Sequence, residues 1–296
     1  MRSVIAVLLV GLLACPPTAN AVENQPLHVV ASFSILGDMV KNIGGNMVVV
    51  STLVGPDQDA HTYQPTPGDA KTLTTADIVF VNGLGFEGWM QRLIQASGTK
   101  AKIITLTDDM QSRIIYSLKN VPDPHAWQNP INGRIYARHI ATALEEALPE
   151  QAQSIYSRAV AYDSKLEQLD QFIRSQIDMI PEAKRKIITS HDAFAYFGAA
   201  YGITFLSPVG ISTEAEPSAV DVARLIDQIK HENIKRVFLE NTANPKLIQQ
   251  IAKDAGAAVG GKLYADSLSA PNGPASSYIS MFQYNIMMMK SAMTAR

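Results

Sequence analysis

Residues 150–180 read EQAQSIYSRAVAYDSKLEQLDQFIRSQIDMI, and this stretch decides the fold that the sequence predicts. Its apolar and aromatic residues recur in steps of three and four, which places them on one face of an α-helix. They are Ile155, Ala159, Tyr162, Leu166, Leu169, Ile173, Ile177 and Ile180. Pro149 suits the start of such a helix and Pro181 suits its end. At 1.5 Å per residue the helix spans on the order of 45 Å, so we expect a stiff rod.

On both sides of this rod, short apolar runs alternate with helical stretches. The predicted strands are Leu27–Phe33, Met47–Leu53, Asp77–Val81 and Lys102–Leu106 before the rod, and Lys186–Thr189, Thr204–Leu206, Arg236–Leu239 and Lys262–Ala265 after it. The predicted helices are Ile35–Ile43, Pro67–Thr74, Gly88–Ala96, Ala193–Tyr201, Ser218–His231, Pro245–Ala255 and Ala275–Met293. Such alternation favours mainly parallel sheets. We expect an α/β fold of two lobes, 22–148 and 182–296, joined by a long rigid backbone helix over 149–181.

The composition of the chain excludes several classes of function. The chain has 296 residues, 47% of them hydrophobic, which is enough for a core in each lobe. A balance of 25 basic against 27 acidic residues argues against nucleic acid as a partner, because phosphate binding needs clustered cations. The single cysteine excludes a disulfide framework, a cysteine-based zinc site and an iron–sulfur cluster.

Residues 1–21 are predicted to be a signal peptide. Arg2 supplies the positive start, Val4–Leu13 form an apolar run too short to stay in a membrane, and Ala19–Ala21 form a small-x-small cleavage site. A competing interpretation makes Cys15 a lipidated residue. We expect cleavage after Ala21 and a periplasmic location, where nicotinamide and ATP chemistry is not expected.

Four residues could form one metal site. His61 and His125 lie in turn-rich, proline-stiffened loops, whereas His191 and Asp266 each follow a predicted strand. The carboxyl ends of strands are where open α/β sheets bind ligands. Three imidazoles and one carboxylate suit a divalent transition metal held between the lobes.

Neighbouring aspartates could orient these histidines as acceptors for their ring N–H groups. They are Asp59, Asp123 and Asp192. The remaining histidines, His28, His139 and His231, are interpreted as structural.

Three other patterns suggest different chemistry, and we interpret each as structural. Gly83–Gly88 matches the dinucleotide pattern G-x-G-x-x-G but follows the third strand, so it is predicted to be a tight turn. The methionines of the last helix point in different directions and fit core packing better than a copper site. Ser190, His191 and Asp192 are adjacent in sequence and therefore cannot adopt the geometry of a catalytic triad.

Six segments together resemble one protein family. They are GPDQDAHTYQPTP (55–67), NGLGFEGW (82–89), DPHAW (123–127), TSHDAF (189–194), GISTEAEPS (210–218) and YADSLSAPNGP (264–274). In this order they resemble the zinc/manganese solute-binding proteins of ABC importers, the TroA-like or ZnuA-like family. The resemblance implies two α/β lobes bridged by a rigid helix, with metal ligands at His61, His125, His191 and Asp266.

The resemblance also implies a metal, a partner and a mode of action. Zinc is the expected ion and manganese, with iron, the alternative, because His191 occupies a position where many manganese or iron binders have glutamate. Many zinc-specific relatives carry a His-rich loop before the second ligand, whereas Thr107–Pro124 holds no histidine. The partner would be an ABC transporter membrane permease, and we expect a monomer.

Two other classes of function remain open. Four protein ligands leave no position for a reacting water, so we expect a carrier and no enzyme activity. A metal-dependent hydrolase would need an open coordination position. A surface adhesin would need lipidation at Cys15.

Overall fold

The structure is a computed structural model that describes residues 25–110, 114–116 and 120–294. The expected signal peptide (1–21) and Cys15 lie outside the described residues. Each half of the molecule is built on one four-stranded sheet, and all paired strands in both sheets are parallel. This confirms the α/β fold with parallel sheets that the alternating pattern predicts.

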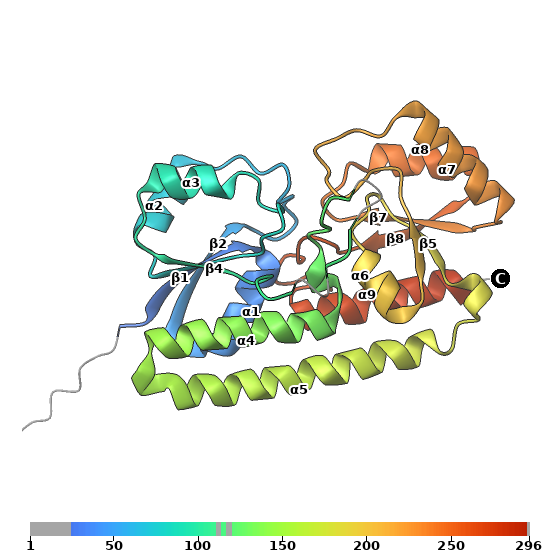
Figure 1. Cartoon of the computed structure of the whole chain (residues 1–296). Coiled ribbons are helices and arrows are strands. Elements are labelled where there is room, and N and C mark those ends of the chain that lie inside the picture. The colour runs from blue at the N-terminus through green and yellow to red at the C-terminus, as the bar shows by residue number, and fades with distance from the viewer. Residues whose placement is uncertain (1–24, 111–113, 117–119, 295–296) are drawn as a thin grey trace, which may run out of the picture.

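The N-terminal half contains the strand order β2-β1-β3-β4 (Figure 1). Its strands are β1 (Leu27–Phe33), β2 (Val48–Val54), β3 (Ile78–Val81) and β4 (Lys102–Thr105). The C-terminal half contains the order β6-β5-β7-β8. Its strands are β5 (Lys186–Ile188), β6 (Thr204–Leu206), β7 (Arg236–Glu240) and β8 (Ala258–Leu263). The two orders are equivalent, so the carboxyl ends of the central strands form a corresponding edge in each half.

Helices connect and cover the strands. They are α1 (Ser34–Gly44), α2 (Pro67–Thr74), α3 (Met90–Ser97), α4 (Pro130–Ala147), α5 (Ala152–Ile177), α6 (Ala195–Tyr201), α7 (Ala219–His231), α8 (Pro245–Ala255) and α9 (Tyr278–Thr294). Polar caps followed by proline start several of them: the side chains of Asn129 and Asn244 accept hydrogen bonds from the first turns of α4 and α8. No helix in the described ranges is long and apolar enough to cross a membrane.

The long helix α5 runs beneath both halves (Figure 1). It packs on α1 and α4 of the N-terminal half and on α6 and α9 of the C-terminal half. Its 26 residues span about 39 Å. The face predicted from the three-and-four spacing is the buried one, with Ala159 only partly covered. The helix is shorter than expected at both ends: residues Pro149–Gln151 form a separate 3-10 turn, and residues 178–180 lie beyond its last turn.

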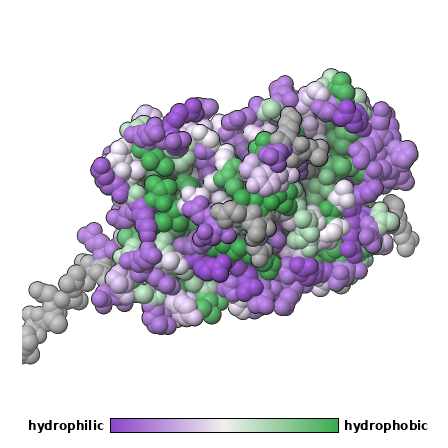
Figure 2. All heavy atoms as spheres, in the orientation of Figure 1, coloured by the Kyte–Doolittle hydropathy of each residue, from purple (hydrophilic) through white to green (hydrophobic). Residues whose placement is uncertain are grey.

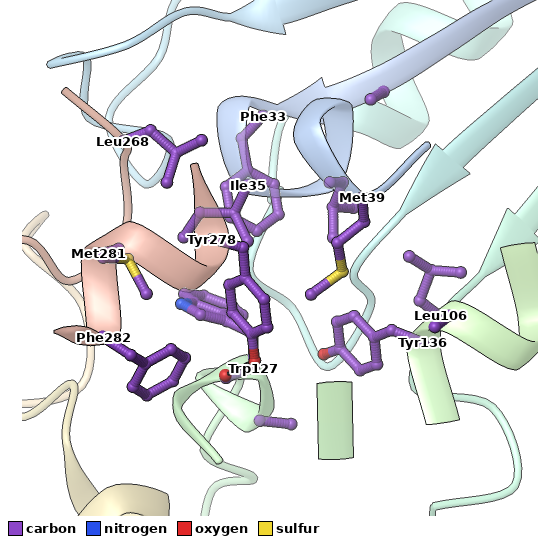
Figure 3. Close-up of a cluster of buried hydrophobic side chains, with 14 of the residues drawn as sticks. Phe33, Ile35, Met39, Leu106, Trp127, Tyr136, Leu268, Tyr278, Met281 and Phe282 are labelled. Atoms are coloured by element: carbon purple, nitrogen blue, oxygen red, sulfur yellow. Dashed lines mark hydrogen bonds between the residues drawn. The ribbon is translucent and has the colours of Figure 1, made fainter. Parts of the chain in front are cut away.

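One hydrophobic core extends through both halves and along α5. Figure 3 shows its centre, where Phe33, Trp127 and Tyr278 meet from three distant parts of the chain. A smaller, separate core packs α7 and α8 on the C-terminal sheet and includes Val237 and Leu225. Figure 2 shows hydrophilic residues over most of the visible face, with apolar residues in patches within and between the halves.

Two elements differ from the sequence prediction. The last strand, predicted at Lys262–Ala265, lies earlier, at Ala258–Leu263. Its glycines Gly260 and Gly261 obscured it, and its pairing with β7 is irregular at this point. Helix α4 was not among the predicted helices. It contributes fully buried residues such as Tyr136 and Ile140 to the larger core.

Candidate metal centre

His61 lies in the loop that follows β2. Its backbone N–H donates to Oδ1 of Asp59 (2.8 Å), and its ring packs edge-on against Phe86, with 4.7 Å between ring centroids. The indole nitrogen of Trp89 donates to the carbonyl oxygen of Ala60, 2.8 Å away, which fixes the backbone just before His61. His61 is 5% exposed and lines a groove of about 730 Å³ between the halves.

His125 is fully buried at the start of the 3-10 turn Ala126–Gln128. Oδ1 of Asp123 accepts both the backbone N–H (2.9 Å) and Nδ1 (2.7 Å) of His125. The Nδ1 proton therefore points at Asp123, and Nε2 is the nitrogen left to face the centre of the molecule.

His191 follows β5 and is held from the neighbouring strand β7 by Glu240. Oε1 of Glu240 accepts the backbone N–H groups of Ser190 (2.7 Å) and His191 (3.0 Å). Its second oxygen, Oε2, contacts Nδ1 of the His191 ring. Both residues are almost completely buried.

Asp266 follows β8 and is fully buried. The carbonyl oxygen of the preceding residue, Ala265, accepts hydrogen bonds from the side chains of Trp127 (3.0 Å) and Gln128 (2.7 Å). These bonds tie the chain at Asp266 to the segment that carries His125, although the two residues are far apart in sequence.

The structure brings together all four side chains that the sequence singles out. One nitrogen or oxygen of each lies within 4.8 Å of those of the others. Nε2 of His61 is 3.3 Å from Nε2 of His125 and 3.5 Å from Oδ2 of Asp266. Nε2 of His191 is 3.1 Å from the same Oδ2, and Nε2 of His125 is 3.5 Å from Oδ1. A tetrahedral zinc ion with ligands at about 2.0–2.1 Å needs ligand atoms about 3.3–3.4 Å apart, and these four distances of 3.1–3.5 Å are close to that value.

The hydrogen bonding of these atoms also fits a metal site. Both carboxylate oxygens of Asp266 and Nε2 of His191 are buried without a hydrogen-bond partner. Buried polar atoms are normally paired, so these unpaired atoms have the chemistry expected of metal ligands. Because Oδ1 and Oδ2 face different histidines, Asp266 could bind through one oxygen or both.

The charges in the site compensate one another. Burial alone would lower the pKa of His191, but the carboxylates of Glu240 and Asp266 raise it well above its usual value. Burial would raise the pKa of Asp266, but His191 and His125 hold it well below its usual range. A cation binding at His191 would therefore compete with a proton.

The neighbouring carboxylates differ from the sequence prediction. Of the three expected to orient histidine rings, Asp123 alone contacts a ring within the described residues. Asp59 accepts the backbone N–H of His61, and the backbone N–H of Asp192 donates to Gly210. The sequence prediction missed Glu240. Its signal was its place at the end of a buried strand, where a carboxylate is otherwise unfavourable.

The dinucleotide-like segment is a tight turn, as predicted. Gly83 and Gly85 have positive φ angles of 92° and 83°. The buried carboxylate of Glu87 accepts the backbone N–H groups of Asn82 (2.7 Å) and Gly83 (3.2 Å) and the hydroxyl of Ser32 (2.6 Å). It therefore occupies amides that a phosphate would need.

The methionines of α9 mostly pack in the core, as expected. Met281, Met289 and Met293 are buried, whereas Met287 is 51% exposed. Ser190 and His191 do not form a triad pair, because the two ring nitrogens of His191 face the carboxylates of Glu240 and Asp266 and not the Ser190 hydroxyl.

Comparison with known proteins gives one consistent family. A family model described as zinc-uptake complex component A, periplasmic (ZnuA), matches residues 29–292. The manganese-binding lipoprotein MntA of Halalkalibacterium halodurans is 31% identical over 269 residues, covering 91% of this chain and 89% of the relative. The iron-binding protein YfeA of Yersinia pestis is 34% identical over 280 residues, with coverage of 91% and 89%.

Solved structures agree with this result. The periplasmic zinc binding protein TroA from Treponema pallidum superposes with a TM-score of 0.88 at 26% identity, covering 92% of this chain and all of that one. These three relatives are named for manganese, iron and zinc.

Proposed function

The chain belongs to the ZnuA family of periplasmic zinc-uptake components, and on that premise we propose that it captures zinc outside the inner membrane and delivers it to a permease. It is a metal-binding substrate-binding protein of an ABC importer and not an enzyme. The ion is the transported substrate, and the partner of such a protein is the membrane permease.

The proposed ligands are His61, His125, His191 and Asp266. The observation that carries this assignment is the convergence of their four donor atoms within 4.8 Å of one another, with His61 and His125 3.3 Å apart and His191 and Asp266 3.1 Å apart. Four protein ligands fill the coordination sphere of zinc, which suits a carrier that binds and releases its cargo.

Zinc is the metal that we propose, with manganese or iron as the alternative. Three imidazole nitrogens favour zinc, whereas added carboxylate oxygens favour manganese. The carboxylate of Asp266 could use both oxygens, and this favours the alternative, since a fifth ligand atom suits a larger ion. The different metals of the relatives' names make a direct comparison of the two ions necessary.

The proposed organisation follows the sequence prediction. Residues 1–21 direct export to the periplasm, 22–148 and 182–296 form the two lobes, and 149–181 form the link between them. We propose a monomer with no nucleic-acid partner. Mass spectrometry of the exported protein distinguishes cleavage before Val22 from lipidation at Cys15.

The deciding experiment is metal analysis of the full chain purified from the periplasm, followed by competition between zinc and manganese. We expect one zinc per chain and loss of tight binding in His191→Ala. The matched control is His231→Ala, which removes an exposed histidine on α7. Retention of manganese against excess zinc would establish the alternative metal. Unchanged binding in His191→Ala would overturn the assigned site.

A further inference from the structure

Glu240 is a buried carboxylate for which the four-ligand site has no direct use. It is the last residue of β7, and the segment Ser190–His191 leaves the adjacent strand β5. Glu240 is 2% exposed and lies in contact with a proposed ligand rather than among the ligand atoms. An unpaired buried charge destabilises a fold, so a carboxylate at this position is expected to have a specific partner.

Three hydrogen bonds fix Glu240 in place, two of them to its carboxylate. Oε1 accepts the backbone N–H groups of Ser190 and His191 at 2.7 and 3.0 Å. The backbone N–H of Glu240 in turn donates to the hydroxyl of Ser190, 3.2 Å away. Oε2 is thereby directed at Nδ1 of His191, and neither of these two atoms has another partner among the described residues.

This contact determines which ring nitrogen can bind a metal. A carboxylate oxygen accepts hydrogen bonds, so Nδ1 must carry a proton when it faces Oε2. In the neutral ring, Nε2 then keeps its lone pair, and Nε2 is the atom 3.1 Å from Oδ2 of Asp266. Asp123 makes the same arrangement with His125 on the other side of the site.

We propose that Glu240 is a positioning residue for metal capture, which holds His191 with Nδ1 protonated and Nε2 directed at the ion. This inference rests on the proposed ligand role of His191. Carboxylates that orient metal-bound histidines in this way contribute 10–100-fold to metal affinity in other proteins.

The substitution Glu240→Gln tests the proposal, because it keeps the shape of the side chain and replaces one carboxylate oxygen by an NH₂ group. Oε1 must still accept two backbone N–H groups, so the new amide NH₂ would face Nδ1 of His191. An amide NH₂ group only donates hydrogen bonds, so Nδ1 would have to lose its proton to accept one. The ring proton then moves to Nε2, which can no longer bind the ion.

The experiment titrates the full-length exported chain with zinc ions in the presence of a competing chelator. We expect the dissociation constant for zinc to rise about 10–100-fold in Glu240→Gln. It should stay within about twofold of the native value in Glu182→Gln, a matched control at an exposed position of the same half. Equal zinc affinity of native chain and Glu240→Gln would overturn the proposal.

A second measurement separates positioning from a structural role. Long-range ¹H–¹⁵N spectra of the zinc-loaded native chain should show His191 with a proton on Nδ1 and zinc on Nε2. Zinc on Nδ1 would overturn the proposal even if Glu240→Gln fails to fold. If the native chain binds no zinc, or His191→Ala binds as well as the native chain, the proposed function fails instead.

Discussion

The indole nitrogen of Trp127 donates a hydrogen bond to the carbonyl oxygen of Ala265, 3.0 Å away. Trp89, the other tryptophan of the chain, does the same at Ala60 over 2.8 Å. Ala265 precedes Asp266 and Ala60 precedes His61, so each indole fixes the backbone beside one proposed ligand. Both donors are buried, and each links segments that are distant in sequence.

We expect Trp127→Phe to weaken both the fold and the metal site. The change removes one hydrogen bond and part of a buried ring, and should lower the free energy of unfolding by about 2–3 kcal/mol. Zinc affinity should fall as well, because Asp266 loses one of its backbone restraints. Urea denaturation and zinc titration measure the two effects. Tyr156→Phe, at an exposed site on α5, is the control. Native zinc affinity in Trp127→Phe would contradict this role.

Two of the three candidate orienting aspartates, Asp123 and Asp192, should differ sharply in their effect on zinc affinity. Asp123→Asn should raise the zinc dissociation constant about 10–100-fold, because Oδ1 of Asp123 contacts Nδ1 of His125 at 2.7 Å. Asp192→Asn should have a much smaller effect, because its side chain contacts no histidine ring within the described residues. Calorimetric or chelator-competition titrations of both variants test this difference. Equal losses of zinc affinity in the two variants would mean that the negative charge near the site, and not the orientation of the His125 ring, determines the affinity.

Zinc affinity should increase with pH up to values above the ordinary histidine pKa of 6.5. Glu240 and Asp266 raise the pKa of His191, so the proton that competes with zinc persists to higher pH than usual. Titrations between pH 5 and 9 should also show proton release on binding. A dependence that ends below pH 6 would contradict the raised pKa.

The stability of the metal-free chain should have the opposite dependence on the alkaline side. The contribution of His191 is fully present below its ordinary pKa of 6.5 and is lost as pH rises through the raised value. The contribution of Asp266 is present above its ordinary pKa of 3.8 and is lost as pH falls through the lowered value. Thermal melts without metal should therefore peak between these two limits. In His191→Ala, the alkaline decline should be reduced.

The long helix can be tested by a pair of substitutions on its opposite faces. Ile173→Ala removes a fully buried side chain of α5 and should cost about 2–5 kcal/mol of stability. Val160→Ala, at a position 51% exposed on the same helix, should change stability by no more than about 0.5 kcal/mol. Chemical denaturation of both variants measures the difference. Similar effects would mean that the predicted apolar face does not hold the helix in place.

Much of this fold could be predicted from local pattern. The spacing along Ile155–Ile180 predicted the buried face of α5, and the apolar runs located most strands to within one or two residues. The pattern failed at β8, where Gly260 and Gly261 do not look like strand residues, and at α4, whose face is covered by other helices.

The candidate site was predictable only in its four proposed ligands. Three histidines in stiff loops and at a strand end, together with an aspartate at another strand end, indicate a site in combination, because open α/β sheets bind ligands at these ends. Glu240 was not recognised, since its role depends on the pairing of β5 with β7, and no spacing in the sequence reports that neighbour. The same holds for the two indole donors, whose acceptors lie up to 138 positions away.

The shared core has a consequence for dissection of the molecule. Side chains from β1, η3 (Ala126–Gln128) and α9 fill one continuous apolar interior (Figure 3), so neither half contains all the surfaces that it buries. A fragment ending before α5, or starting after it, would present that interior to water and should aggregate rather than fold. Separate expression of the two sheets would therefore not yield two working pieces.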